Sequence, residues 1–129
     1  MDLTYLANLQ KQWAPKVVVP PENAGYAPQQ DDVIFSLDIQ YVGNTAFVGL
    51  DIQRYSGQFL STYVGQASVD TEYVPQFFCF REGPPLLKVI NFVQQHFNLS
   101  PNVLIVDGHG IAHPRRFGVA CWLGVQTNL

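Results

Sequence analysis

Runs of apolar residues divide the chain into segments with different predicted structures. Three segments, 33–42, 46–55 and 58–67, have the length and composition of β-strands. The dipeptides Gly43-Asn44 and Ser56-Gly57 separate them, and both are typical of hairpin turns. The pattern therefore predicts an antiparallel meander of three strands that begins near Val33.

A helix and a short strand are predicted after the meander. Apolar residues recur at helical spacing from Leu86 to Phe97, and Gly83-Pro84-Pro85 before them suits a helix start. Residues 103–106 form an apolar run without alternation, which is typical of a parallel strand buried on both faces. Three antiparallel strands, a crossover helix and a central parallel strand beside the first form the opening half of a ribonuclease H-like α/β fold.

The first 32 residues differ from this predicted domain. Leu3, Leu6 and Leu9 are spaced near one helical turn and predict a short helix that Pro15 closes. From Pro15 to Asp32 the composition shifts to Pro, Gln, Asn and Gly, which predicts a surface linker. We therefore expect a helix and linker over 1–32 and the α/β domain over 33–129.

Composition and charge narrow the classes of function. The chain has 129 residues, of which 47% are hydrophobic, enough for one small core. A formal net charge of −3 excludes a broad basic field for nucleic acid, so any phosphate contact must be local. Two cysteines without a signal-like N-terminus indicate a cytoplasmic protein, or a nuclear one in a eukaryote. No apolar stretch approaches the roughly 20 residues that span a bilayer, so no membrane role is expected.

The stretch LIVDGHGIAHPRRFG, residues 104–118, carries the candidate chemistry. Asp107 ends a buried strand, where the carboxyl ends of parallel strands form the ligand crevice of α/β sheets. The glycines that follow allow close backbone approach, and His113 and the two arginines add donors and positive charge. This combination is expected where an anionic, phosphate-bearing substrate meets a metal ion.

Simpler interpretations of the same residues remain open. Asp107 and the glycine after it are also typical of a turn that caps a helix beside surface arginines. Zinc binding by Asp107, His109 and His113 is disfavoured, because the glycines favour a loop and no cysteine pair lies nearby. Cys121 stands in an apolar segment and is expected to pack rather than act as a nucleophile.

Two longer motifs resemble the endonuclease V family, nucleases that recognise inosine. They are DGHGIAHPRRFGVA at 107–120 and YVPQFFCFREGPPLL at 73–87, and the resemblance extends from Val33 to Leu129. It implies a ribonuclease H-like fold and a Mg²⁺-dependent endonuclease, with Mn²⁺ as an alternative metal. The implied partner is inosine-containing DNA or RNA, which is cut on the 3′ side of the inosine.

The resemblance also implies metal ligands. Glu82 of the FREG motif and Asp107 match the family directly, together with an aspartate on the first strand. LDIQ occurs twice, and we choose Asp38 over Asp51 because SLDIQY takes the place of the family's Gly-Val-Asp segment. Strand alternation puts Asp38 on a polar face, opposite Leu37, which suits either a site or plain solvent exposure.

Substrate contacts are implied by the same motifs. Tyr73 matches a wedge that inserts into the nucleic acid so that the inosine is turned out, and Gln76 replaces the glycine that commonly follows this wedge. His113 matches a histidine near the scissile phosphate and joins the expected catalytic residues. The expected substrate-binding residues are Tyr73, Val74, Pro75, Gly108, Gly110, Ile111 and Arg115.

The sequence departs from the family in two respects. Trp122 stands where the family often has a histidine, and the chain ends before the region that supplies a catalytic lysine, so that the C-terminal half of the usual fold is missing. Half a sheet leaves an open edge and an uncovered apolar face. We therefore expect a homodimer or a second chain that completes the fold. The alternatives to an active enzyme are a catalytically impaired inosine-binding module and a partner-dependent fragment of a longer nuclease.

Overall fold

The structure is a computed structural model and describes residues 2–129. Its contacts fall into two compact units, which are described separately. One combines the segments up to Gly25, Thr71–Pro84 and Gly108–Leu129, and we call it the loop unit. The other combines Tyr26–Asp70 and Pro85–Asp107, and we call it the sheet unit.

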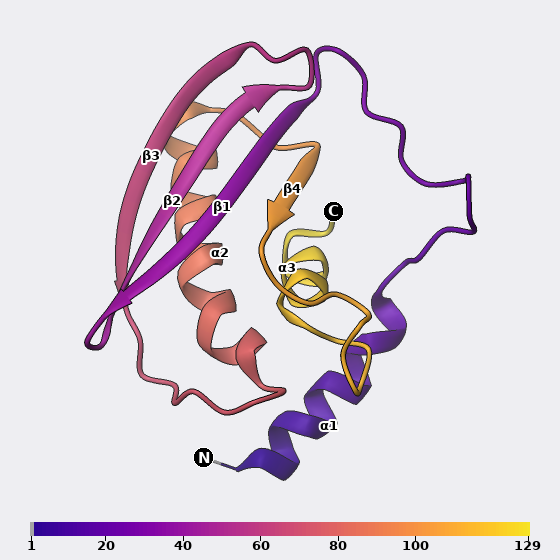
Figure 1. Cartoon of the computed structure of the whole chain (residues 1–129), viewed down its shortest axis with the longest axis vertical. Helices are drawn as coiled ribbons and strands as arrows, with labels where there is room; N and C mark the ends of the chain where they lie inside the picture. Colours follow the sequence, from indigo (N-terminus) through magenta and orange to yellow (C-terminus); the bar gives the residue numbers. More distant parts are fainter. Residues whose placement is uncertain (1) are drawn as a thin grey trace. The chain divides into compact units, whose positions relative to one another are not determined.

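The sheet unit contains the meander that the sequence predicts. Strands β1 (Val33–Val42), β2 (Thr45–Arg54) and β3 (Phe59–Ser68) pair antiparallel in sequence order (Figure 1). Gly43 and Gly57 have φ angles of 58° and 98°, in the left-handed region that the hairpin turns require. The predicted strands are thus confirmed to within about one residue at each end.

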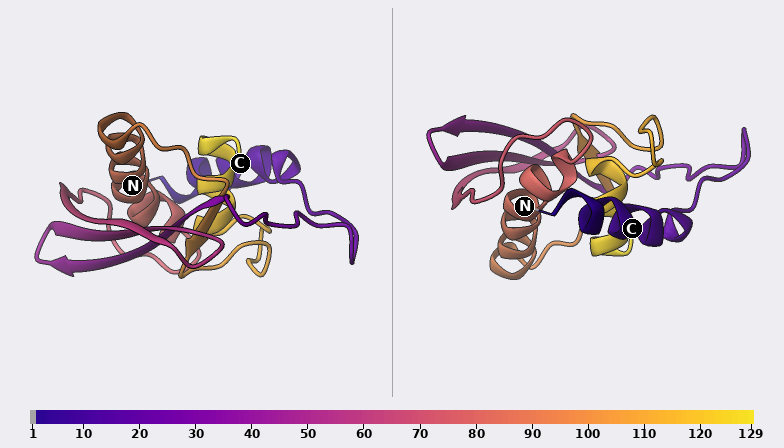
Figure 2. Two further views of the ribbon diagram at one scale, coloured as in Figure 1. Left: turned by 90° about the horizontal axis from the view of Figure 1, so that it is seen from above. Right: turned by 90° about the horizontal axis from the view of Figure 1, so that it is seen from below.

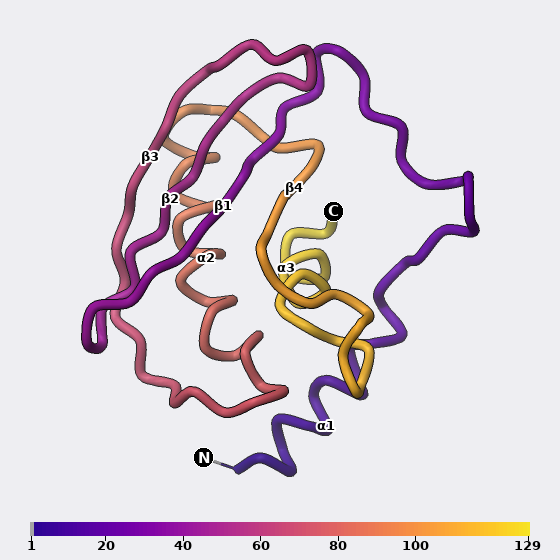
Figure 3. The backbone as a smooth tube through the Cα atoms, viewed as in Figure 1, coloured from indigo at the N-terminus to yellow at the C-terminus, as the bar shows by residue number. Residues whose placement is uncertain are grey.

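Strand β4 (Val103–Val106) pairs parallel with β1 and gives the sheet order β3-β2-β1-β4 (Figure 3). The predicted parallel pairing beside the first strand is confirmed, but the predicted burial of this strand on both faces is not. In this sheet β4 lies at an edge, and Ile105 is 53% exposed. Four apolar residues in a row do not distinguish a strand covered on both faces from one covered on one face.

One face of the sheet packs against helix α2 (Phe78–Phe97), as Figures 1 and 2 show for its later turns. Leu37 on β1 opposes Leu50 on β2, and both are buried. Tyr63 on β3 stacks on Phe92 of α2 with ring centroids 5.1 Å apart. Because side chains alternate along a strand, the intervening residues lie on the opposite face, which is the polar one.

Helix α2 begins at Phe78, before the position that the sequence predicts. Pro84 and Pro85 were expected at its start and instead lie inside it. A proline has no N–H, so neither of them donates to the carbonyl four residues earlier. The early start places the FREG motif, including Glu82, on the helix rather than in the loop before it.

The loop unit is built from α1 (Leu3–Trp13), the short 3₁₀ helix η1 (Ala14–Lys16), the first turns of α2, and α3 (Val119–Thr127). The Asp2 carboxylate caps α1 by accepting a hydrogen bond from Tyr5 N at 3.1 Å. Trp13 packs near Phe80 and Phe117, with centroid distances of 6.4 and 6.0 Å. No prediction was made for α3, because its residues are apolar all round and show no helical period.

Residues 17–32 form neither helix nor strand and are mostly exposed, as expected of a linker. The contacts do not separate 1–32 as one piece, since the part up to Gly25 groups with later segments and the rest with the sheet. The domain boundary at residue 33 therefore stays a prediction. Within the described residues, no helix combines the length and the hydropathy needed to cross a bilayer.

Candidate functional site

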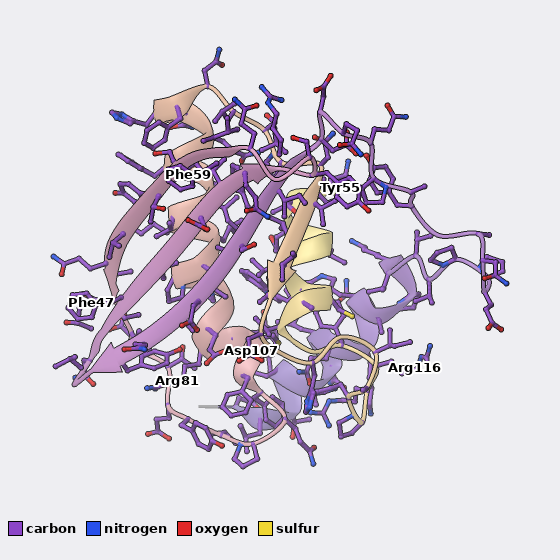
Figure 4. All side chains as sticks on the ribbon, turned by 45° about the horizontal axis from the view of Figure 1, so that its top comes forward. Phe47, Tyr55, Phe59, Arg81, Asp107 and Arg116 are labelled. Carbon is purple, nitrogen blue, oxygen red and sulfur yellow. The ribbon has the colours of Figure 1, made fainter. Side chains whose placement is uncertain are left out.

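Two predicted metal ligands lie side by side in the sheet unit. The β1–β4 ladder ends with the pair Leu37 and Val106; Asp38 is the next residue on β1, and Asp107 directly follows the end of β4. Figure 4 labels Asp107 at the end of β4. Residues in register on neighbouring parallel strands share a face and lie about 4.8 Å apart across the sheet. Both side chains are exposed, so the pair forms a concentration of negative charge on the polar face.

Asp51, the alternative first ligand, lies on the same face but farther from Asp107. It sits on β2 opposite Ser36, and its Oδ1 accepts a hydrogen bond from Thr62 Oγ1 at 2.6 Å. Asp38, Asp51 and Thr62 line one shallow hollow on this face. Because β1 alone separates β2 from β4, the register favours Asp38 as the partner of Asp107.

The third predicted ligand, Glu82, belongs to the loop unit and lies in the second turn of α2, half-buried. Within residues 2–129 no group of three or more His, Cys, Asp or Glu side chains is arranged to hold a metal ion. This includes the zinc alternative with His109 and His113. The set of three carboxylates therefore stays a prediction. The structure places Asp38 and Asp107 in the sheet unit and Glu82 in the loop unit.

The predicted wedge forms an exposed turn before α2. Tyr73 is 62% exposed, and its ring lies edge-on to Phe78 with centroids 4.5 Å apart. Phe77 N donates to Val74 O at 3.0 Å and closes the turn. Gln76 lies inside this turn with a φ of 72°, the left-handed region in which glycine is unstrained. Gln76 thus has a left-handed backbone conformation that would suit the glycine commonly found at this position in the family.

The loop at 108–118 is fixed by the start of α3. Gly118 N donates to Gly110 O at 3.1 Å, and Ala120 N donates to His109 O at 3.0 Å. A Cβ on Gly108 would collide with the Val119 side chain, so this glycine is required for close packing. Within the loop, Ile111 is exposed. The residues predicted to line the inosine pocket thus come from one loop segment that these hydrogen bonds tie to the start of α3.

His113 uses both of its ring nitrogens inside the protein. Its Nδ1 accepts from Arg115 N at 3.0 Å, and its Nε2 lies 2.7 Å from the Gln76 carbonyl oxygen. The carbonyl can only accept, so Nε2 carries the proton and Nδ1 does not. Burial lowers the pKa of His113, and the nearby positive charge of Arg115 acts in the same direction. The lowered pKa favours the neutral ring, and the two hydrogen bonds fix its orientation.

Arg115 is directed into the protein rather than toward solvent. Its Nε donates to Gln10 Oε1 at 2.5 Å, and its NH2 donates to Gln76 O at 3.2 Å. The guanidinium also lies 4.7 Å from the centre of the Phe77 ring. Arg116, labelled in Figure 4, is exposed instead. Of the two arginines, the second is thus better placed for a phosphate.

Gln10 was not among the residues predicted from the sequence to belong to the site. It lies on α1 at four residues from Leu6 and seven from Leu3, so it falls on the apolar stripe of the helix. It is fully buried. A polar residue on an apolar stripe is the signal that could have identified it, because burying an amide without partners is unfavourable.

Neither cysteine is a candidate nucleophile. Cys79 and Cys121 are both free and buried. Burial raises the pKa of Cys79 to about 11 and also raises the pKa of Cys121. The reactive species of cysteine is the thiolate, so both side chains are inert thiols that pack in the loop unit.

Acidification is expected to destabilise the fold through His113. The folded-state pKa lies below the ordinary 6.5, so the unfolded chain binds more protons between these two values. Stability therefore rises with pH across that window and is lost as the pH falls through it. Urea unfolding at about pH 7.5 and about pH 5.5 should show a larger loss for the wild type than for His113→Asn. Equal losses in both proteins would contradict this assignment.

The chain is similar to proteins of one family over most of its length. The Endonuclease V family model matches residues 17–129. An endonuclease V of Saccharolobus islandicus (strain M.14.25 / Kamchatka #1) is 37% identical over 125 residues, covering 95% of this chain and 57% of the relative. One of Saccharolobus solfataricus is 42% identical over 94 residues, covering 71% of this chain and 43% of the relative. The chain thus spans about half the length of these relatives.

Solved structures give the same result. The catalytic domain of human endonuclease V is 29% identical with a TM-score of 0.85, covering 98% of this chain and 55% of that one. Endonuclease V of Ciona intestinalis, in a D234N variant bound to DNA with an inosine followed by a ribo-adenosine, has a TM-score of 0.84. It is 21% identical over 98% of this chain and 54% of that one, so it supports the fold alone. The α/β fold with three antiparallel strands and one parallel strand is confirmed.

Proposed function

Because the chain belongs to the endonuclease V family, we propose that it binds an inosine-containing strand and takes part in Mg²⁺-dependent cleavage on the 3′ side of the inosine. One observation carries this proposal: Asp38 and Asp107 are both exposed and directly follow the last registered pair of the β1–β4 ladder. Neighbouring exposed carboxylates offer the oxygen ligands that a divalent cation requires. A bound divalent metal is therefore the function that this arrangement supports best.

The donor chemistry fits Mg²⁺. Carboxylate oxygens are the ligands that this hard cation prefers, and exposed carboxylates leave room for the waters that it retains. We propose Asp38, Asp107 and Glu82 as the residues that hold it, with Glu82 contributed by α2. When bound, the metal would supply an activated water and stabilise the leaving oxygen of the phosphodiester.

The loop unit supplies the proposed strand-binding groups. Tyr73 and the turn around it are exposed, and the backbone at 108–111 lies in a separate fixed segment of the same unit. His113 acts in this proposal by holding its loop, since both ring nitrogens are hydrogen-bonded inside the loop unit. Arg116 supplies the positive charge for the phosphate backbone.

Replacing Tyr73 by alanine is expected to weaken binding to an inosine strand by about 1–3 kcal/mol, the usual contribution of an aromatic ring that stacks on a base. Tyr73→Phe keeps the ring and should bind nearly as well as the wild type. Fluorescence anisotropy with a labelled single-inosine oligonucleotide measures both. Equal weakening by the two changes would show that the hydroxyl, not the ring, makes the contact.

A nicking assay tests the proposed function directly. Single-inosine oligonucleotides, in DNA and RNA form, are incubated with the chain and Mg²⁺ or EDTA, beside guanosine strands of the same sequence. Mg²⁺-dependent cuts on the 3′ side of inosine support the proposal. A folded chain that neither cuts nor prefers inosine strands overturns it.

A second candidate, an inosine-binding module without catalysis, has its own support. No group of three metal-ligating side chains occurs within the described residues, and His113 is engaged internally. Inosine-selective binding by a folded chain, without cleavage in Mg²⁺ or Mn²⁺, would select this alternative. Recovery of cleavage on addition of a second chain would instead indicate a partner-dependent fragment.

A further inference from the structure

The amide of Gln10 is the one buried polar side chain among residues 2–129. It is fully enclosed, on a helix whose other described residues are all at least partly exposed. Gln12, two residues later on the same helix, is exposed. A buried amide is tolerated where hydrogen bonds satisfy both its ends. The partners of Gln10 therefore indicate what it does.

Those partners come from two segments far apart in the sequence. Gln10 Nε2 donates to the Gln76 carbonyl oxygen at 3.0 Å, which lies directly after the Tyr73–Pro75 turn. At the other end of the amide, Gln10 Oε1 accepts from Arg115 Nε at 2.5 Å, two residues beyond His113. One side chain thus links the wedge turn to the 108–118 loop, and all three segments belong to the loop unit.

The Gln76 carbonyl oxygen is the centre of this network. It accepts from Gln10 Nε2, from His113 Nε2 at 2.7 Å and from Arg115 NH2 at 3.2 Å. Its direction depends on the φ of 72° at Gln76, a conformation that is unfavourable for a residue with a side chain. Such a conformation persists where the surroundings impose it. The three donors around the carbonyl are these surroundings.

We propose that Gln10 is a positioning residue that sets the Tyr73 wedge and the His113 loop in one arrangement for inosine recognition. This inference rests on the proposed function, because both segments are the strand-binding groups of that proposal. In this proposal Gln10 does not contact the substrate. It acts through Gln76 and Arg115, and so decides how far the wedge lies from the pocket loop.

The chemistry of the position requires an amide. Glutamate would still accept from Arg115 but has no proton for the Gln76 carbonyl and would repel it. Lysine would donate to that carbonyl but would place its charge against the Arg115 guanidinium. Methionine has similar length and makes neither bond. Only glutamine among these satisfies both segments at once.

The test compares Gln10→Met with Gln12→Met, a matched change at an exposed glutamine of the same helix. Proton–nitrogen spectra of the histidine side chains report the His113 tautomer in the free protein. The wild type and Gln12→Met should show one tautomer with the proton on Nε2. Gln10→Met should show mixed tautomers, because Arg115 and the Gln76 carbonyl each lose a partner.

Binding to single-inosine and matched guanosine oligonucleotides gives the second measurement. Gln10→Met should lose about five- to tenfold of the preference for inosine, the usual effect of removing a buried hydrogen-bond partner. Gln12→Met should keep the wild-type preference for inosine. In the first measurement, Gln76→Gly should keep the wild-type His113 tautomer, because glycine accepts the same φ and retains the carbonyl. Folding is checked by circular dichroism, and Gln10→Glu replaces Gln10→Met if that variant does not fold.

The outcomes separate this inference from the proposed function. A folded Gln10 variant with a wild-type His113 spectrum and wild-type inosine preference overturns the positioning role. A wild-type chain without any preference for inosine overturns the proposed function and the substrate part of the inference. In that case the His113 spectrum still decides whether Gln10 holds the two segments together.

Discussion

Replacing Asp107 by asparagine is expected to reduce Mg²⁺-dependent cleavage at inosine by on the order of a hundred- to a thousandfold, the scale set by losing one stabilising group at a reacting phosphate. Asparagine keeps the size of the side chain but removes the charge that attracts a hard cation. The loss should appear in kcat, measured by single-turnover cleavage of a labelled inosine strand. Binding of the strand in EDTA should be unchanged or slightly stronger, since one negative charge is gone.

Asp51→Asn is the matched control for this change. Asp51 lies on the same sheet face and also carries a charge, but it pairs with Thr62 and stands a strand farther from Asp107. Its replacement should leave cleavage within about twofold of the wild type, as is usual for exposed side chains outside a site. If Asp51→Asn abolished cleavage and Asp38→Asn did not, the choice of Asp38 as metal ligand would be wrong.

A measurement of thermal stability also tests whether Asp107 binds the metal ion, and it does not require the chain to cleave a substrate. A cation that binds only the folded chain stabilises it, and the melting temperature rises with the logarithm of the cation concentration once this exceeds the Kd. Mg²⁺ should therefore stabilise the wild type and Asp51→Asn, but not Asp107→Asn. Equal stabilisation of all three proteins would place the cation elsewhere.

Gly118→Ala is expected to destabilise the fold by about 3 kcal/mol or more, at the upper end of the usual cost of overpacking. The backbone at Gly118 is extended, so its dihedral angles suit any residue. The obstacle is steric: a Cβ there would lie 2.6 Å from the carbonyl carbon of His109. That carbonyl accepts from Ala120 N, so it cannot move away without opening the start of α3. Urea unfolding followed by circular dichroism measures the loss.

Gly110→Ala is the corresponding control in the same loop. A Cβ on Gly110 would lie 3.8 Å from Cys121 Sγ, an ordinary packing distance, and its φ is not in the left-handed region. The change should alter stability by less than about 1 kcal/mol. Equal destabilisation by both alanines would show that the loop needs backbone freedom rather than space.

The meander was predictable because its signals are local. Turn dipeptides and strand-like composition fix hairpins without knowledge of distant residues, and the three strands appear where expected. The start of α2 was predicted too late, because prolines are commonest in the first turn of a helix but are not confined to it. The exposure of Ile105 was not predicted, because it depends on whether another element covers that face of the sheet. The residues of the strand itself do not show this.

The candidate site stays a prediction, and its residues could be placed to a similar extent. The choice of Asp38 and Asp107 rests on strand alternation combined with the family motif, and the structure adds that both directly follow the last pair of the β1–β4 ladder. The bonds of His113 and Arg115 to Gln76 were not predictable, because they join residues 37 and 39 positions apart. Gln10 is more remote still, at 105 positions from Arg115, and only the folded chain brings them together.

The packing of Gly108 against Val119 and of Gly118 against His109 has a consequence for how such sequences are interpreted. These glycines belong to the motif that identifies the family, yet the contacts that require them are internal to the loop. Folding of the loop is then a sufficient reason for glycine at both positions, whatever chemistry the chain performs. A match to these glycines therefore indicates the shape of the loop, whereas the proposed chemistry depends on the acidic pair beside the β1–β4 ladder.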